Sequence, residues 1–326
     1  MVTIKEVAKL AGVSPTTASY ALNNRPEVKE ATRNKVQWAA KQLNYVPNKL
    51  AQSIRNGKSN TIMVVTSESI DCGNTFSAEF LGILSGAKQL NYDVLVKLVN
   101  SQSIRDNEID DLTGSFCDGH LLLGNHLDRI AQVLTQRDKK CIMLSSHSDA
   151  PIRQVNSDGR LWIRKITEHI IAHGRKKAAY FCYELGTVEE NLRYLGYCDA
   201  IAENVSRQEP LLFCCGSNGA ELSTKVQEAI LAGCDAIVCW NDFLAVQVIE
   251  QLHSFGHCVP QQIAVTGFDD NLSYSNSIYH LTTVRQDFRL KGETAIKELV
   301  DQINGKIPLE RNIFVDCSLV ERSSTG

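Results

Sequence analysis

The sequence predicts an α/β protein: a small helical head and a hinge helix, followed by two doubly wound parallel-sheet lobes. Three observations predict this arrangement. Residues 3–22 carry the pattern of two short helices joined by a turn. From residue 61 onward, short apolar runs typical of buried strands alternate with helical patterns. The alternation starts again near residue 158, and two successive sets of this kind indicate two lobes.

The composition is that of a globular protein, with 43% hydrophobic and 22% charged residues in 326. No apolar run approaches membrane-spanning length and the N-terminus lacks a signal-peptide pattern, so we expect a cytoplasmic protein with no membrane partner. The eleven cysteines contain no CxxC pair and fit free thiols in a reducing compartment. No metal site and no cofactor are expected.

Charge is unevenly distributed along the chain. Residues 1–60 contain ten lysines and arginines but three acidic residues, whereas the whole chain has a net charge of −3. A basic head on an acidic body is typical of one domain that meets phosphates and one that does not. A basic face can also be merely solvated, so the charge alone does not decide.

The first two helices of the head form a helix-turn-helix pattern. Gly12 suits the left-handed residue that ends a helix, Ser14 is a good N-cap, and Pro15 is tolerated at the first helical position. An isolated match of this kind can be a helical hairpin that only packs; in a DNA-binding protein the second helix enters the major groove. The side of that helix away from the core shows Pro15, Thr16, Ser19, Tyr20 and Asn23.

A third helix over about 30–43 closes this unit, and Pro47 ends it, which gives a helix-turn-helix domain over residues 1–46. Asn48 then caps a helix of about two turns, with Ala51 and Ile54 on its apolar side. A helix this short does not persist alone in water, so residues 47–59 are expected to be a hinge helix and linker that folds on DNA.

Four segments follow one another in residues 2–60: TIKEVAKLAGVS, TRNKV, LNYVPN and LAQSIR. In their order and spacing they resemble the DNA-binding head of the lac repressor family of transcription regulators. The resemblance implies that double-stranded operator DNA is a partner, with Thr16 and Tyr20 near base edges and Ile54 as an apolar wedge in the minor groove. Tyr20 stands where relatives often carry Arg or His, and Ile54 replaces a leucine. The DNA-contacting residues we expect are Thr3, Ser14, Pro15, Thr16, Thr17, Ser19, Tyr20, Asn23, Asn48, Ala51 and Ile54.

The body alternates strands and helices throughout. We expect strands at 61–65, 94–99, 120–123, 141–144, 178–182, 211–214, 236–238 and 263–266. We expect helices at 76–90, 104–113, 128–136, 162–172, 191–203, 220–232 and 243–255. In doubly wound folds, ligands bind at the carboxyl ends of the strands, here between the lobes.

The body also resembles the family's effector domain, which is similar to periplasmic sugar-binding proteins. The matching segments are RYLGY at 193–197, WND at 240–242, VPQQIAVTGFDD at 259–270 and LTTVRQ at 281–286. The resemblance implies one effector-binding and dimerisation domain over 60–326. Its N-lobe would span about 60–157 and 287–315, and its C-lobe about 158–286 and 316–326.

A sugar site needs planar groups that exchange hydrogen bonds with hydroxyls, and an aromatic face. Arg193, Asn241 and Asp269 supply the first kind at positions that the resemblance marks as effector-contacting, and Phe76 and Trp240 supply rings. Asn241 and Asp269 can also be helix N-caps after strands. The segment Ser145–His147 departs from the family, where an Asp-Arg pair is common.

We therefore expect a homodimeric, sequence-specific transcription repressor controlled by a small-molecule effector, a sugar or sugar derivative. Because the sequence carries no leucine heptads near residue 326, a dimer is preferred to a tetramer. The alternative is a sugar-binding protein without a regulatory DNA role, which the basic head disfavours. An enzyme is not expected and no catalytic residue is assigned, since the SSHSD run at 145–149 puts Ser, His and Asp in one loop rather than on separate elements.

Overall fold

The computed structural model describes residues 2–46, 57–67, 74–100, 104–204, 209–216, 219–271, 279–306 and 310–326. The chain divides into two compact units, Met1–Ser59 and Asn60–Gly326. The predicted hinge residues Asn48, Ala51 and Ile54 lie outside the described residues.

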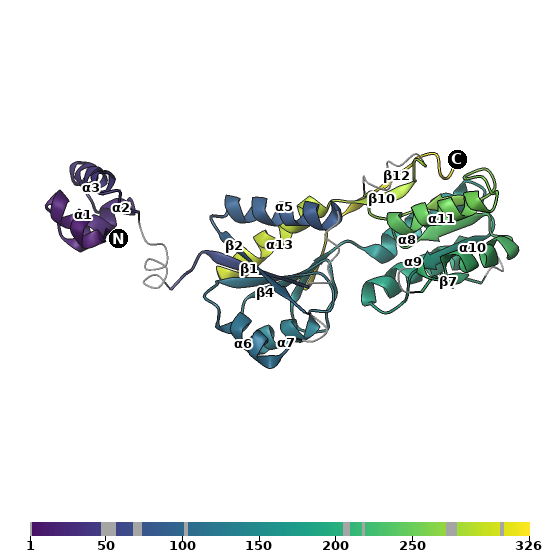
Figure 1. Cartoon of the computed structure of the whole chain (residues 1–326), viewed down its shortest axis with the longest axis horizontal. Helices are drawn as coiled ribbons and strands as arrows, with labels where there is room; N and C mark the ends of the chain where they lie inside the picture. The colour runs from purple at the N-terminus through teal and green to yellow at the C-terminus, as the bar shows by residue number, and fades with distance from the viewer. Residues whose placement is uncertain are drawn as a thin grey trace. The chain divides into compact units, whose positions relative to one another are not determined.

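The described part of the first unit folds as helices α1 (Ile4–Ala11), α2 (Pro15–Leu22) and α3 (Glu30–Gln42), drawn in purple in Figure 1. Gly12 ends α1 with φ 66°, and the Ser14 hydroxyl caps α2 by accepting a hydrogen bond from the Thr17 N–H at 3.0 Å. A small apolar core holds the helices together, formed by Val7, Ala8, Ala18, Ala21, Val28, Val36, Ala39 and Ala40. The predicted helix pair and its turn are therefore confirmed.

The N-lobe is a parallel sheet with helices on both faces (Figure 1). Among the described residues its strand order is β11-β5-β4-β3-β1-β2. One apolar core lies between the sheet and helices α5 and α13, and another lies between the sheet and helices α6 and α7. The elements are β1 (Thr61–Ser67), α5 (Asn74–Gln89), β2 (Asp93–Val99), α6 (Asp106–Gly114), β3 (Gly119–Leu123), α7 (Asp128–Gln136), β4 (Cys141–Leu144), β5 (Arg153–Asn156), α13 (Phe288–Ile303) and β11 (Asn312–Phe314).

The C-lobe repeats this plan with a parallel sheet of order β7-β6-β8-β9. An antiparallel pair, β10 with β12, adds to it through isolated bridges such as Thr266 with Thr282. Helices α8 and α9 cover one face, and α10 and α11 cover the other. The elements are α8 (Gly159–Ala172), β6 (Ala178–Cys182), α9 (Val188–Asn204), β7 (Leu212–Cys214), α10 (Leu222–Leu231), β8 (Ala236–Cys239), α11 (Asp242–Ser254), β9 (Ala264–Thr266), β10 (Thr283–Gln286) and β12 (Cys317–Val320).

The predicted fold class is confirmed, and every predicted strand and helix of the body is present with ends displaced by a few residues. Sequence analysis did not predict β5, β10, β11, β12 or α13. The strands are three or four residues long and β5 reads RQVN, so none carries an apolar run. β2 also differs from its prediction as a buried strand, because it lies at the edge of the sheet with most of its side chains exposed.

Helices α5 and α13 approach each other so closely that Gly82 has no room for a side chain. A Cβ built on Gly82 would overlap the backbone carbonyl of Arg289, which cannot move independently of α13. We expect Gly82→Ala to lower the free energy of unfolding by at least about 2 kcal/mol, measured by urea titration of the full chain. Gly114→Ala is the matched control, because a Cβ there meets nothing within 4 Å. Equal stability of the two variants would contradict the close approach.

Candidate functional site

The helix α2 presents polar side chains at the surface of the first unit. Pro15, Thr16 and Asn23 are exposed, and the Tyr20 side chain is 45% exposed. Pro15 and Thr16 lie in the first turn of α2, Tyr20 lies about one turn later, and Asn23 follows at the C-terminal end of the helix. A helix of this kind on a packed scaffold suits major-groove reading, because base edges are contacted from the N-terminal part of the recognition helix.

Three other residues expected to touch DNA are engaged within the head. The Glu6 carboxylate accepts hydrogen bonds from the Thr3 N–H at 2.7 Å and from the Thr3 hydroxyl at 2.9 Å. Ser14 and Thr17 share a hydrogen bond of 2.8 Å between their hydroxyls. These contacts fix the starts of α1 and α2, and all three residues stay at least partly accessible.

Ser19 corrects the prediction for the exposed side of α2. Its side chain is only 4% exposed, because α2 packs against both α1 and α3 and its buried arc is wider than a single apolar stripe. Ser19 is therefore not on the face with Thr16 and Tyr20.

The described lysines of the head are all exposed, as neutralisation of phosphates requires: Lys5, Lys9, Lys29, Lys35, Lys41 and Lys58.

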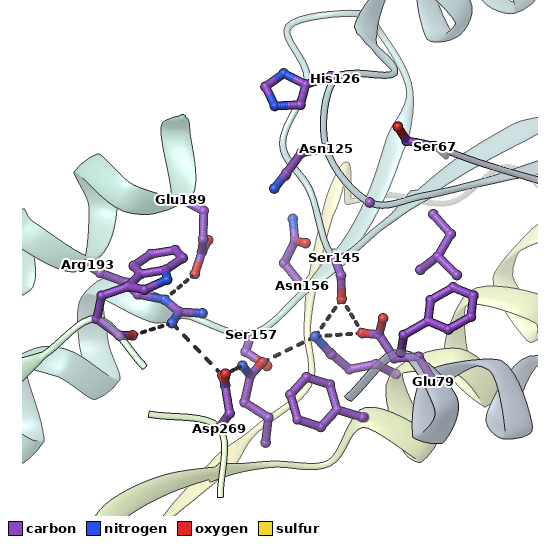
Figure 2. A pocket seen from close by; sticks show the side chains of 17 residues that line it. Ser67, Glu79, Asn125, His126, Ser145, Asn156, Ser157, Glu189, Arg193 and Asp269 are labelled. Carbon is purple, nitrogen blue, oxygen red and sulfur yellow. Dashed lines mark hydrogen bonds and ion pairs between the residues drawn. The ribbon is translucent and has the colours of Figure 1, made fainter. Parts of the chain in front are cut away.

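A cavity of about 380 Å³ lies between the two lobes of the second unit, at the carboxyl ends of the strands (Figure 2). Its volume suits a small ligand. Both lobes contribute polar side chains, and rings from both also line it. The described lining residues are Ser67, Phe76, Glu79, Leu123, Gly124, Asn125, His126, Ser145, Asn156, Ser157, Glu189, Arg193, Trp240, Asp269, Gln286, Phe288 and Lys291.

Arg193 dominates the C-lobe wall of this cavity. Its guanidinium lies between two aromatic rings, 4.0 Å from the centre of Trp240 and 3.9 Å from that of Phe268. Its Nε donates to Glu189 at 2.9 Å and a terminal nitrogen donates to the Trp240 carbonyl oxygen at 2.8 Å. Asp269 lies 4.0 Å away. Burial raises the pKa of Asp269, although Arg193 partly opposes that effect. Stacked and held in this way, Arg193 is a rigid donor for ligand oxygens.

The N-lobe wall carries a second charged group. Lys291 on α13 lies 2.9 Å from the Glu79 carboxylate on α5 and donates to the Ser145 hydroxyl at 2.6 Å and to the Gln286 side-chain oxygen at 3.2 Å. The Ser145 hydroxyl also bonds to Glu79. Gln286 in turn donates to Asp269 at 2.7 Å. A continuous chain of polar contacts thus joins the two walls, as the dashed lines of Figure 2 show.

The structure brings Phe76, Arg193, Trp240 and Asp269 together in the cavity lining. Asn241 is not among the lining residues. Its side-chain oxygen accepts a hydrogen bond from the Leu244 N–H at 2.9 Å and caps α11, so Asn241 has the role of a helix N-cap, the alternative to an effector contact given in the sequence analysis. Sequence analysis missed Glu79, Ser145, Gln286 and Lys291. Glu79 and Lys291 read as ordinary charged residues of helical segments, and only the packing of α5 on α13 makes them a buried pair.

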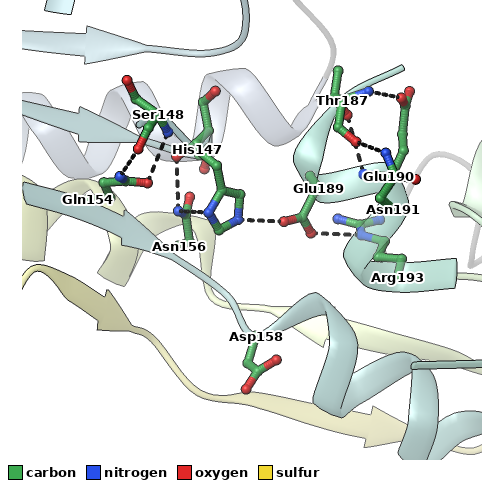
Figure 3. Close-up of polar contacts among 12 residues, drawn as sticks. His147, Ser148, Gln154, Asn156, Asp158, Thr187, Glu189, Glu190, Asn191 and Arg193 are labelled. Atoms are coloured by element: carbon green, nitrogen blue, oxygen red, sulfur yellow. Dashed lines mark hydrogen bonds and ion pairs between the residues drawn. The ribbon is translucent and has the colours of Figure 1, made fainter. Parts of the chain in front are cut away.

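A second contact between the lobes lies beside the cavity (Figure 3). His147, in the loop after β4, is 3.0 Å from the Glu189 carboxylate in the first turn of α9. Burial alone would raise the pKa of Glu189, but Arg193 and hydrogen bonds from His147 and Arg193 outweigh it and lower the pKa to about 2. Glu189 therefore bridges Arg193 in its own lobe to His147 in the other lobe, as a carboxylate throughout the neutral range.

Glu189→Gln is expected to destabilise the protein in a pH-dependent way. A carboxyl whose pKa falls on folding stabilises the folded state above its unfolded pKa, and that contribution is lost as pH drops through the folded value. The deficit of the variant, roughly 2–3 kcal/mol at pH 7 by urea titration, should shrink between pH 4.5 and 2. Glu203→Gln, at an exposed pair with Arg164, is the control with little effect at any pH. A deficit that stays constant with pH would contradict the electrostatic account.

Within the described ranges, no group of three or more His, Cys, Asp or Glu side chains is placed to hold a metal ion. No helix in those ranges is both long enough and apolar enough to span a bilayer.

Comparisons with known proteins found relatives for both units of the chain. Residues 3–48 match the model of bacterial regulatory proteins of the lacI family, and residues 167–325 match that of a periplasmic binding protein-like domain. The HTH-type transcriptional repressor PurR of Mannheimia succiniciproducens is 31% identical over 346 residues, which cover 99% of this chain and 98% of that protein. The lactose operon repressor of Escherichia coli is 28% identical, over 99% of this chain and 91% of its own length. The solved structure of the lac repressor dimer bound to operator and the anti-inducer ONPF is similar with a TM-score of 0.84, at 27% identity and 99% coverage of both chains.

Proposed function

Because this chain belongs to the lacI family of bacterial regulatory proteins, we propose that it is a transcriptional repressor that a small molecule controls. In this proposal residues 1–46 bind operator DNA, residues 47–59 form the hinge, and residues 60–326 bind the effector and dimerise. The observation that carries the DNA-binding role is the exposed polar side of α2, with Thr16 and Tyr20 positioned on a packed three-helix head.

The cavity between the lobes supports the effector role. It combines the stacked Arg193 with carboxylates, amides and hydroxyls on both walls, and Phe76 and Trp240 add aromatic faces. Such a lining suits a sugar or a related polyhydroxylated compound. Because both lobes contribute, a bound molecule would change the relative stability of closed and open arrangements, and it can shift that equilibrium only by its difference in affinity for the two.

An apolar edge of the N-lobe supports a homodimer, in keeping with the dimer named for the lac repressor structure. Leu95 and Leu98 on the edge strand β2 are 50% and 57% exposed, and Leu81 on α5 is also exposed. Exposed leucines next to an edge strand mark an interaction surface, since a monomer would leave them in water. The operator is then expected to be a pseudo-palindrome that the heads of two subunits read. We expect the protein to act in the cytoplasm.

Footprinting on DNA upstream of the protein's own gene and its neighbours tests the proposal, with and without a panel of sugars and nucleosides. A protected pseudo-palindrome that one compound relieves or strengthens is the expected result, and binding should weaken steeply as salt rises. Absence of sequence-specific protection, together with ligand binding by the isolated chain, would favour the alternative of a sugar-binding protein without a regulatory DNA role.

A further inference from the structure

The N-lobe wall of the cavity contains a buried ion pair that folding alone does not require. The side chains of Glu79 and Lys291 are 6% and 3% exposed and lie against apolar neighbours such as Phe288, whose ring centre is 4.8 Å from the lysine nitrogen. Removing two charges from water is costly, and replacing such a pair by apolar side chains is often neutral or stabilising. The pair is thus weak evidence for stability, and its position on a cavity wall points to a ligand.

The charges on the described lining are nearly all matched within the protein. Lys291 is paired with Glu79, and Arg193 is paired with Glu189 and lies near Asp269. The described carboxylates of the lining outnumber its lysine and arginine side chains: Glu79, Glu189 and Asp269 against Arg193 and Lys291. An anionic ligand would have to displace a carboxylate from its cation, and it would also meet the remaining carboxylates at close range. An uncharged ligand meets neither cost.

A hydroxyl group has the chemistry that this wall can accept. It donates to the Glu79 carboxylate and accepts from Lys291, as the Ser145 hydroxyl already does in the structure. The Ser145 hydroxyl is therefore an example, within the protein, of the kind of group that the Glu79–Lys291 pair binds. A site built to hydrogen-bond hydroxyls rejects analogues that lack them, because its own buried polar groups are then left unpaired.

Building on the effector pocket proposed above, we propose that Glu79, Lys291 and Ser145 form a specificity-determining subsite that selects an uncharged, hydroxyl-bearing ligand and rejects phosphorylated or carboxylated ones. The subsite rests on side chains from α5, α13 and the loop after β4, and it faces Arg193 across the cavity. The two polar walls then bind opposite ends of one neutral molecule.

Matched pairs of compounds test the ligand class on the full-length protein. Calorimetric titration compares glucose with glucose 6-phosphate, ribose with ribose 5-phosphate, galactose with galactonate, and adenosine with adenosine monophosphate. The neutral member of at least one pair is expected to bind, at least about tenfold tighter than its anionic partner. Tighter binding by an anionic member, or no binding by any neutral member, would overturn the proposal.

Variants test the residues themselves. Glu79→Gln leaves Lys291 without its carboxylate, so 50 mM inorganic phosphate, compared with chloride at equal ionic strength, should raise the melting temperature of this variant by about 2 °C more than that of the wild type. The basic head is the same in both proteins, so binding of phosphate there cancels. The double variant Glu79→Leu/Lys291→Leu should melt within a few degrees of the wild type and bind the neutral compound about 100-fold more weakly. Equal phosphate responses of the wild type and Glu79→Gln, or unchanged binding by the double variant, would overturn the subsite.

The operator footprint separates this proposal from the function on which it rests. A protein that protects an operator but responds to an anionic compound keeps the repressor function and loses the subsite. If the protein binds no operator, the repressor function is wrong. The calorimetric comparison of neutral with anionic compounds still tests the subsite in that case.

Discussion

The Arg193→Lys variant is expected to bind operator DNA as tightly as the wild type and to lose its response to the ligand. Lysine keeps the positive charge, but its compact ammonium group cannot lie flat between Trp240 and Phe268, and it lacks the planar, fixed donor geometry with which Arg193 reaches Glu189 and the Trp240 carbonyl. Loss of this fixed donor should weaken ligand binding about 100-fold, as removal of a charge-assisted, buried hydrogen-bond set does.

Calorimetry with the responsive compound and footprinting with the same preparation measure the two effects. Arg160→Lys is the matched control, because Arg160 pairs with Asp199 at the surface between α8 and α9 and does not line the cavity. Wild-type ligand affinity of Arg193→Lys would show that the C-lobe wall does not hold the ligand. Loss of operator binding along with ligand binding would indicate a general folding defect.

The second large effect is expected at the head, for the double variant Thr16→Ala/Tyr20→Ala. Both side chains are exposed on α2, so their loss should leave the three-helix core intact. Each base-edge contact contributes about 1–3 kcal/mol of discrimination, so operator affinity should fall roughly 100-fold or more. Affinity for random DNA and its dependence on salt should change little, because contacts of lysines with DNA phosphates dominate this sequence-independent affinity.

Fluorescence anisotropy with operator and random duplexes over a range of salt concentrations makes the comparison. Gln37→Ala, exposed on α3, is the control that should bind both duplexes as the wild type does. If the double variant lost operator and random binding in parallel, α2 would not be the element that reads sequence.

Local sequence patterns predicted most of the fold. Apolar runs such as 141–144 and 178–182 became strands with the predicted ends, because buried parallel strands need continuous apolar side chains. The missed strands β5, β11 and β12 are short, and each is held by pairing with a distant segment, as when Asn312–Phe314 joins Gln154–Asn156. Pairing over such separations leaves no local signal. Helix α13 differs from these strands, because its buried residues Ala295, Ile296, Leu299 and Val300 do form a helical stripe in the sequence, although it is not among the predicted helices.

The cavity was predictable in part. Arg193, Trp240 and Asp269 follow recognisable segments at strand ends and helix starts, and they line the cavity. Asn241 has the same kind of position, but its oxygen is used by the first turn of α11. The pairing of Glu79 with Lys291 depends on how two helices more than 200 residues apart in sequence pack, which glycines at 82 and 292 permit. Neither residue alone distinguishes a solvated charge from a buried one.

The segments that join the lobes also constrain how the protein is made. The chain leaves the N-lobe after β5, returns for α13 and β11, and ends its last strand in the C-lobe with β12. A ribosome therefore cannot release a finished N-lobe or a finished C-lobe until residues 288–320 have emerged. The head, made of one continuous stretch, can fold once its 46 residues are clear of the exit tunnel. A nascent chain would thus carry a folded, basic DNA-binding head for most of its synthesis while the segment that completes its ligand pocket is still untranslated.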